Sequence, residues 1–377
     1  MPQDLLAAAR ALAPRIAALA EETERGRRLP AELVSAFAEA GFFGMCVPRD
    51  LGGPEADPAV LLDTVETLAA ADGAAGWCAM IAATTSVLAA YLPDADARTI
   101  YGTPGTATGG AYAPQGRATT VSGGYRVTGR WPFASGCEHC AWLTGGSLVQ
   151  SAGGQPEARL MMFPVSEVEI IDTWNVSGLR GTGSHDIAVR DVFVPAARAI
   201  SLTIDRPRRG GTLYAFPVFG LLALGGAAVA TGIARHAVDE LVSLAATKTA
   251  TLQRRRLAER PVVQAKVAEA EALLGSARAF LREAVERGWE SAARGGGIPL
   301  VDRARLRLAA THATATAARA VDLMYTAAGG TAIYAASPFQ RCLRDAHAVT
   351  QHVMVAEPTY ELVGRVLLGV DADTAQL

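Results

Sequence analysis

Six histidines are the side chains of this 377-residue chain best suited to moving a proton near neutral pH. His347 and His352 lie only five residues apart. If one helix carries both, their side chains lie about 140° apart around its axis. They then cannot both face one pocket, so we expect at most one of the two to be catalytic.

Two other groups of residues suggest chemistry but fail on geometry or on number. Ser184-His185-Asp186 has the residue types of a hydrolase triad, but neighbours on a strand point to opposite faces, and the chain has no G-x-S-x-G motif. Cys137-Glu138-His139-Cys140 has zinc-ligand types, but a structural zinc needs four ligands and no second pair occurs. We therefore expect buried cysteines beside a polar turn, no metal and no hydrolysis.

Two kinds of phosphate-binding motif can be looked for in the sequence, a glycine-rich loop and a cluster of arginines. The G-x-x-x-x-G-K-[ST] loop is absent, and the glycine-rich pieces do not sit at a strand-to-helix turn. The run Arg254-Arg255-Arg256 is either a solvated face or a phosphate clamp that uses fork-shaped hydrogen bonds. Both interpretations stay open at this point.

Composition restricts the function classes. The net charge of −2 lacks the basic excess of a nucleic-acid binder, and the 50% hydrophobic content is enough for a large core. Five cysteines, an odd number, favour a reducing compartment. The amphipathic N-terminus carries acidic residues and lacks the pattern of a signal peptide, and the apolar stretch 213–230 contains Pro217. We expect that stretch to be a buried helix of a cytoplasmic protein that neither spans a membrane nor binds nucleic acid.

Three regions must position these groups. Residues 1–105 and 206–377 show helical spacing of apolar residues, whereas residues 106–205 show strand-like alternation. We predict helices over 31–40, 58–71 and 73–91, and strands within 125–133, 160–165, 168–174 and 186–194. Few helices fit the middle region, so an antiparallel sheet is expected there. The steps of four and three from Val263 to Ala284 predict a helix that packs in a bundle.

Several segments together resemble the acyl-CoA dehydrogenase superfamily. They are Gly129–Gly136, Asp172–Ser184 followed by Asp191–Pro195, Gly329–Thr331 and Arg341–Ala346. The resemblance implies an α+β fold with an N-terminal helical domain (1–105), a middle antiparallel β domain (106–205) and a C-terminal four-helix bundle (206–377).

The branch of the superfamily follows from a missing carboxylate. Dehydrogenases of the superfamily use a glutamate base, but its usual place reads Thr350–Met354 here, and its other known place, Phe216–Leu221, has no acid. Glu357 lies one helical turn past the usual place and could rescue the base. The Gln351-His352 pair resembles instead the two-component flavin monooxygenases, as do Gly129–Trp142 and Arg256–Gln264.

The resemblance implies a cofactor and roles for named residues. The cofactor is reduced FMN from a separate reductase, with FAD as the alternative. Ser135 would contact flavin N5 through its hydroxyl or its backbone, Phe133 and Trp174 would flank the ring and exclude water, and His352 would act as a general base. Arg254 or Arg256 would hold the flavin phosphate, either within one subunit or across a subunit interface. The bundle segment predicted to meet the cofactor contains Gly329, Gly330 and Thr331.

The predicted substrate pocket includes residues of the helix predicted over 73–91. The monooxygenase branch often has a histidine on the helix predicted over 73–91, which has none here. We assign Trp77, Thr84 and Tyr112 to the pocket, with Thr85 as a further candidate. The predicted function is a homotetrameric, reduced-flavin-dependent monooxygenase of a small aromatic or biosynthetic substrate. The alternatives are an FAD-dependent acyl-CoA dehydrogenase and a non-catalytic scaffold.

Overall fold

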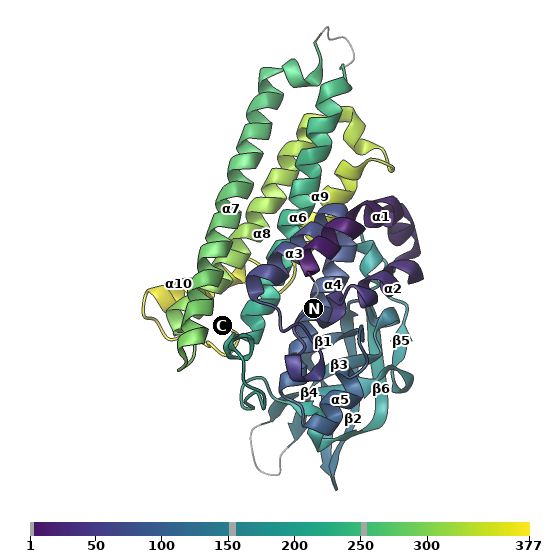
Figure 1. Ribbon diagram of the computed structural model, residues 1–377, viewed down its shortest axis with the longest axis vertical. Helices are drawn as coiled ribbons and strands as arrows, with labels where there is room; N and C mark the ends of the chain where they lie inside the picture. Colours follow the sequence, from purple (N-terminus) through teal and green to yellow (C-terminus); the bar gives the residue numbers. More distant parts are fainter. Residues whose placement is uncertain (1–3, 151–155, 250–254) are drawn as a thin grey trace.

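The computed structural model describes residues 4–150, 156–249 and 255–377, and it places a sheet domain below a long helical bundle (Figure 1). Helices begin where the sequence supplies caps: Asp4, Asp57 and Asp72 each accept a backbone N–H of the helix that follows. The N-terminal helices are α1 (Leu5–Gly26), α2 (Ala31–Glu39), α3 (Pro58–Ala71), α4 (Gly73–Thr85) and α5 (Asp94–Tyr101). The helix predicted over 73–91 is α4 followed by a 3₁₀ segment, Ser86–Ala90.

The middle region forms one seven-stranded sheet in the order β5-β6-β2-β1-β3-β4-β7. Its strands are β1 (Thr108–Val121), β2 (Gly124–Ala134), β3 (Trp142–Gln150), β4 (Glu157–Pro164), β5 (Glu169–Ile171), β6 (His185–Pro195) and β7 (Ala199–Ile200). The strand predicted over 168–174 is thus shorter than expected.

The sheet is mixed, which corrects the prediction of a purely antiparallel one. β1 pairs in parallel with β3, while the other neighbouring strands are antiparallel. The chain leaves β2, turns through Cys137–His139 and returns on the far side of β1, so β3 runs with β1. Spacing within a strand cannot reveal this crossing, because alternation is the same in both pairings.

The C-terminal region is a bundle of long helices, drawn from teal-green to yellow in Figure 1. Its helices are α6 (Val218–Thr247), α7 (Pro261–Arg294), α8 (Leu300–Ala328), α9 (Pro338–Thr350) and the shorter α10 (Pro358–Leu367). The predicted seam of α7 faces the core, with Val263, Leu274 and Leu281 buried.

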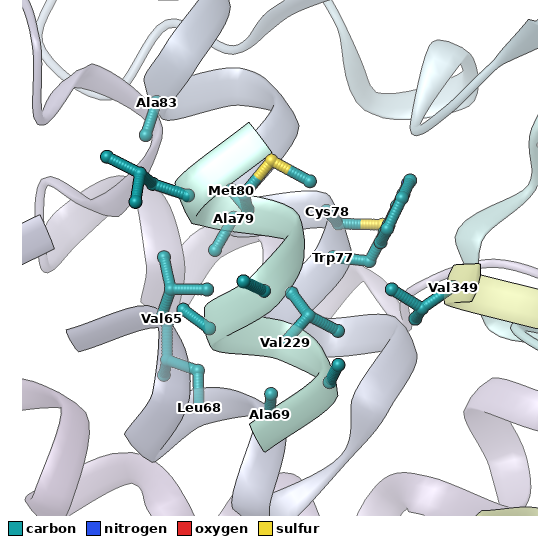
Figure 2. Close-up of a cluster of buried hydrophobic side chains, with 14 of the residues drawn as sticks. Val65, Leu68, Ala69, Trp77, Cys78, Ala79, Met80, Ala83, Val229 and Val349 are labelled. Atoms are coloured by element: carbon teal, nitrogen blue, oxygen red, sulfur yellow. The ribbon is translucent and has the colours of Figure 1, made fainter. Parts of the chain in front are cut away.

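Two segments are long and apolar enough to cross a membrane by length and composition, Gly73–Ala90 and Val218–Thr247. Within the fold, 94% and 78% of their apolar windows are buried. Figure 2 shows why: side chains of α3, α4, α6 and α9 meet in one apolar cluster that includes Val65, Met80, Val229 and Val349. Both segments are therefore core helices of this fold, and the second contains most of the stretch predicted to be buried.

Trp131 fixes the centre of the sheet through a slot lined by glycines. Its indole is fully buried, and its Nε1 donates to the Gly146 carbonyl over 2.6 Å. The ring packs on Gly129 of its own strand, on Gly116 of β1 and on Gly145 of β3. A Cβ at Gly145 would lie 2.6 Å from Trp131 Cζ2, closer than side chains pack. The absence of side chains at these glycines is therefore a packing requirement.

We expect Gly145→Ala to lower the free energy of unfolding by about 1–3 kcal/mol, because the added methyl group overpacks the Trp131 slot. Urea unfolding followed by tryptophan fluorescence measures the change. The control is Gly275→Ala on α7, where no atom lies within 4 Å of the new methyl group. The control should be neutral or stabilising by up to about 1 kcal/mol. Equal changes in the free energy of unfolding in the two variants would contradict the packing role of Gly145.

Candidate active site

Three residues from three regions of the chain meet at the junction of the domains. Trp77 of α4 donates from Nε1 to Ser135 Oγ over 3.0 Å. The His352 ring lies edge-on to the Trp77 ring, with centroids 5.2 Å apart and an interplanar angle of 75°. Trp77 and Ser135 are buried, and His352 is half-buried. The structure thus brings together one predicted pocket residue and both predicted catalytic residues.

The end of β2 turns an aromatic ring outward beside this group. Phe133 has a positive φ of 66°, which is uncommon for a residue with a Cβ and costs about 1 kcal/mol or more. Its ring is 69% exposed and stands edge-on to Trp174, with centroids 6.1 Å apart. Two nearly perpendicular aromatic rings therefore face outward from the strand end that carries Ser135.

Trp174 is held by hydrogen bonds that the sequence does not reveal. Its indole Nε1 donates to the Leu179 carbonyl over 3.1 Å. The backbone N–H groups of Thr173 and Trp174 both donate to Nδ1 of buried His185, each over 3.2 Å. His185 Nδ1 therefore accepts from this loop, and it also lies 3.3 Å from Asp172 Oδ1.

His352 lies beyond the end of α9, so the assumption of one helix through His347 and His352 is wrong. α9 ends at Thr350, and His347 binds Asp322 at the exposed side with 2.9 Å between Nε2 and Oδ1. The two rings occupy separate surroundings, and the expectation that at most one of them is catalytic stays a prediction.

Burial keeps the imidazole of His352 neutral. Burial first, and the positive charge of Arg307 second, lower the pKa of His352 to about 4. Arg307 is itself buried in α8, and its Nε donates to the Met354 carbonyl over 3.2 Å. The Met354 N–H makes a long contact of 3.4 Å with His352 Nδ1. Arg307 thus fixes the turn that carries the imidazole.

Two other predicted pocket residues lie outside this group. Thr84 lies two turns after Trp77 on α4, where its hydroxyl donates to the Met80 carbonyl over 2.8 Å and its methyl group lies towards Gly225 of α6. Its hydroxyl proton is therefore used within α4, while its oxygen can still accept a hydrogen bond. Tyr112 is half-buried beside Thr85, and burial raises its pKa. It packs on a hydrophobic cluster separate from the one that contains Trp77.

The predicted phosphate residues lie at the other end of the molecule. Arg256 starts the turn before α7, where its side chain binds Glu259 and the Ala246 carbonyl. Lys248 donates from Nζ to the Ala328 carbonyl and to the Thr331 hydroxyl, so Gly329, Gly330 and Thr331 adjoin this turn. The end of α6 and the start of α7 lie farthest from the sheet in Figure 1. Arg254 lies outside the described residues.

Sequence reasoning missed the residues behind Ser135. Ser184 Oγ lies 2.7 Å from Ser135 Oγ and 2.7 Å from Thr182 Oγ1. The Leu179 N–H donates to Asp345 Oδ1 over 2.6 Å. Thr182 ends the 3₁₀ turn Arg180–Thr182, and Gly183 has a left-handed backbone conformation, so no regular spacing in the sequence indicated that the hydroxyl groups of Thr182 and Ser184 meet.

The residues at this junction fit the flat, largely apolar ring of a flavin. Phe133 and Trp174 supply aromatic surface, Ser135 supplies a polar atom, and His352 supplies a neutral imidazole. Glu357 is exposed where α10 begins, so no carboxylate replaces the imidazole there. Within the described residues no cluster of three or more His, Cys, Asp or Glu could hold a metal ion.

The state of His352 predicts a dependence of stability on pH. Its folded-state pKa lies below the unfolded value of 6.5, so between about pH 6.5 and 4 the unfolded chain binds more protons and stability falls as the pH falls. We expect His352→Gln to lose less stability over this window than the unmodified protein, as measured by urea unfolding at several pH values. Parallel stability curves for the two proteins would show that the folded state does not hold the imidazole neutral.

Comparison with known proteins places this geometry in a family. Family models match residues 3–95 (acyl-CoA dehydrogenase, N-terminal domain) and 224–357 (acyl-CoA dehydrogenase, C-terminal domain). The indole-3-acetate monooxygenase of Pseudomonas putida is 36% identical over 92% of this chain and 89% of its own. The oxygenase component of the FADH(2)-dependent resorcinol hydroxylase of Rhizobium sp. is 32% identical over 93% and 91%. The crystal structure of the HsaA monooxygenase from M. tuberculosis matches with a TM-score of 0.93, 32% identity and 100% coverage of both chains.

These similarities confirm the predicted fold class and favour the monooxygenase over the acyl-CoA dehydrogenase, because the relatives described above are named as monooxygenases or as the oxygenase component of a hydroxylase. With an imidazole at the domain junction and Glu357 exposed, the chain belongs to the acyl-CoA dehydrogenase superfamily, in its branch of flavin-dependent monooxygenases.

Proposed function

We propose that this oxygenase hydroxylates a small aromatic substrate at the junction of Trp77, Ser135 and His352, with reduced flavin from a separate reductase. The observation that carries the proposal is the packing of a neutral imidazole against Trp77, which itself binds Ser135. The named substrates of the relatives, indole-3-acetate and resorcinol, are aromatic and support this substrate class.

In this proposal, different residues of the chain bind the flavin, exclude water and accept a proton. The bound reduced flavin supplies the electrons that activate dioxygen for transfer of one oxygen atom to the substrate. Phe133 and Trp174 pack on the ring and keep water from it. Ser135 binds the ring edge, and His352 accepts a proton from the substrate. Because a base with a pKa of about 4 is weak at neutral pH, we propose that negative charge brought by flavin or substrate raises the pKa of His352 in the complex.

We further propose that the enzyme is a homotetramer in which the far end of one bundle completes the flavin site of another subunit. Arg256 and Thr331 adjoin the end of α6 and the start of α7, which lie far from the sheet in Figure 1, so we place their contact with the flavin phosphate in another subunit. Ile333 and Tyr334, directly after this segment, are each 70% exposed, which suits a subunit contact. A cytoplasmic location is proposed because all five cysteines are free and buried.

The first test follows the reaction itself. Purified protein, a flavin reductase, NADH and either FMN or FAD should convert members of a panel of phenols and indoles to hydroxylated products, with consumption of oxygen. The parallel assay supplies acyl-CoA thioesters and an artificial electron acceptor. Reduction of that acceptor without product in the first assay would favour the dehydrogenase alternative.

His352→Ala should lower turnover by about 10²-fold or more while flavin affinity changes little, because the base is lost and the ring contacts remain. Single-turnover product formation and flavin titration measure the two quantities. His347→Ala is the matched control, since that ring binds Asp322 at the exposed side of α9. Turnover that stays unchanged in His352→Ala would remove this residue from the mechanism.

Arg256→Ala should weaken flavin binding by about 10-fold or more if its guanidinium holds the phosphate across the subunit contact. Titration of the assembled protein measures the affinity, and sedimentation velocity reports the oligomeric state of the same sample. The control is Arg319→Ala, which removes an exposed arginine on α8 that pairs with Glu269. Equal flavin affinity in Arg256→Ala and in the unmodified protein would place the phosphate elsewhere.

A further inference from the structure

A chain of hydrogen bonds runs behind the predicted flavin contact. Trp77 Nε1 lies 3.0 Å from Ser135 Oγ, Ser135 Oγ lies 2.7 Å from Ser184 Oγ, and Ser184 Oγ lies 2.7 Å from Thr182 Oγ1. Thr182 Oγ1 then donates to the Leu179 carbonyl over 2.8 Å. The exposed fractions of Trp77, Ser135, Ser184 and Thr182 are 5%, 6%, 3% and 1%, so bulk water scarcely competes for these hydrogen bonds.

The two ends of the chain fix the direction of every bond in it. A carbonyl oxygen only accepts, so Thr182 gives its single hydroxyl proton to Leu179. Ser184 must then donate to Thr182, and Ser135 must donate to Ser184. At the other end, an indole N–H only donates, so Ser135 accepts from Trp77. Each bond therefore points from Trp77 towards Leu179.

The acceptor at the end of the chain is held in place. The Leu179 N–H donates to Asp345 Oδ1 over 2.6 Å, and the Leu179 carbonyl also accepts from Trp174 Nε1 over 3.1 Å. Leu179 has a left-handed backbone conformation, with φ 50° and ψ 36°. Arg344, next to Asp345, donates to the Ser177 carbonyl of the same loop. The loop therefore cannot turn its carbonyl away without breaking contacts to α9.

Ser135 is consequently left with no proton to offer. Its hydroxyl proton is used by Ser184, and its backbone N–H donates to the Phe133 carbonyl over 2.9 Å. The hydroxyl oxygen has two lone pairs, of which Trp77 uses one. Towards any ligand at the end of β2, Ser135 Oγ is therefore an acceptor only.

We propose that Thr182 and Ser184 are specificity-determining residues that select the reduced flavin over the oxidised one. A reduced flavin carries an N–H at N5, which matches an acceptor, whereas an oxidised flavin has a bare lone pair there. Ser135 Oγ then accepts a hydrogen bond from N5 of the reduced ring. With the oxidised ring, a lone pair of Ser135 Oγ faces the lone pair of N5, and this repulsion weakens binding. This inference rests on the proposed placement of the ring against Ser135.

The experiment measures the dissociation constants of FMN and FAD for the full-length protein, each in its oxidised and its reduced form. The reduced forms are measured under anaerobic conditions. The quantity of interest is the ratio of the oxidised to the reduced dissociation constant, which should be at least about 10 for the unmodified protein. In Ser184→Ala the Ser135 proton loses its acceptor and is free to turn to N5 of the oxidised ring. We expect the ratio to fall by about 10-fold, mainly through tighter binding of oxidised flavin.

Thr182→Val provides a second, independent variant. Without the Thr182 hydroxyl, Ser184 can donate to Ser135 instead, which frees the Ser135 proton in the same way, so the ratio should fall again. The matched control is Ser147→Ala, a buried serine of β3 whose hydroxyl donates to the Gly145 carbonyl over 3.2 Å. Its ratio should stay at the level of the unmodified protein. Thermal unfolding of each variant establishes that the protein measured is folded.

Ser135→Ala separates failure of the placement from failure of the inference. Unchanged dissociation constants for both redox forms in Ser135→Ala would show that the ring does not lie against Ser135, and the placement itself would be wrong. If Ser135→Ala alters binding but Ser184→Ala and Thr182→Val leave the ratio unchanged, the placement stands and the selection by Thr182 and Ser184 is overturned. A ratio near 1 in the unmodified protein would also overturn it.

Discussion

The hydrogen bond from the Leu179 N–H to Asp345 Oδ1 joins the sheet domain to the bundle, and both halves of the site depend on it. Burial, with the nearby charge of Asp72, raises the pKa of Asp345 to about 7, so this carboxylate is held in the core at an energetic cost. On the sheet side, the Leu179 carbonyl receives the Trp174 indole and the Thr182 hydroxyl. On the bundle side, α9 continues from Asp345 to the turn that carries His352. One residue, Leu179, therefore connects the loop that carries Trp174 to the helix that leads to His352.

The site is built where domains meet, so the packing of helices decides its geometry. Trp77 belongs to α4, which Figure 2 shows among side chains of α3, α6 and α9 in one apolar cluster. Gly73 and Gly76 at the start of α4 leave no room for side chains, because a Cβ at Gly73 would lie 2.9 Å from Ile233 of α6. Interiors packed at this density transmit small displacements. The Trp77 ring is thereby held at a fixed distance from both Ser135 and His352.

An imidazole in place of a carboxylate changes the reaction that the fold can support. A glutamate base can remove a proton from a thioester substrate, whereas a buried neutral histidine adds no negative charge beside the flavin ring. Arg307 maintains this state, since its charge opposes protonation of His352 while its guanidinium holds the turn through the Met354 carbonyl. The exposed position of Glu357 at the start of α10 leaves the imidazole without a competitor.

The sequence by itself determined the three-region layout and the buried helices, because periodicity reports which faces are buried. The roles of Phe133 and Trp174 beside a flavin followed from the resemblance and stay a prediction. The tertiary structure alone decided that β3 runs parallel to β1, that the end of α6 and the start of α7 lie far from the sheet (Figure 1), and that Ser135 meets both Trp77 and Ser184. The physical reason is sequence separation. Trp77 and Ser135 are 58 residues apart, Ser135 and Ser184 are 49 apart, and Leu179 and Asp345 are 166 apart. Hydrogen bonds between residues so far apart in sequence produce no periodic pattern of residue types. The donor and the acceptor of each bond can be assigned only when all the partners are known.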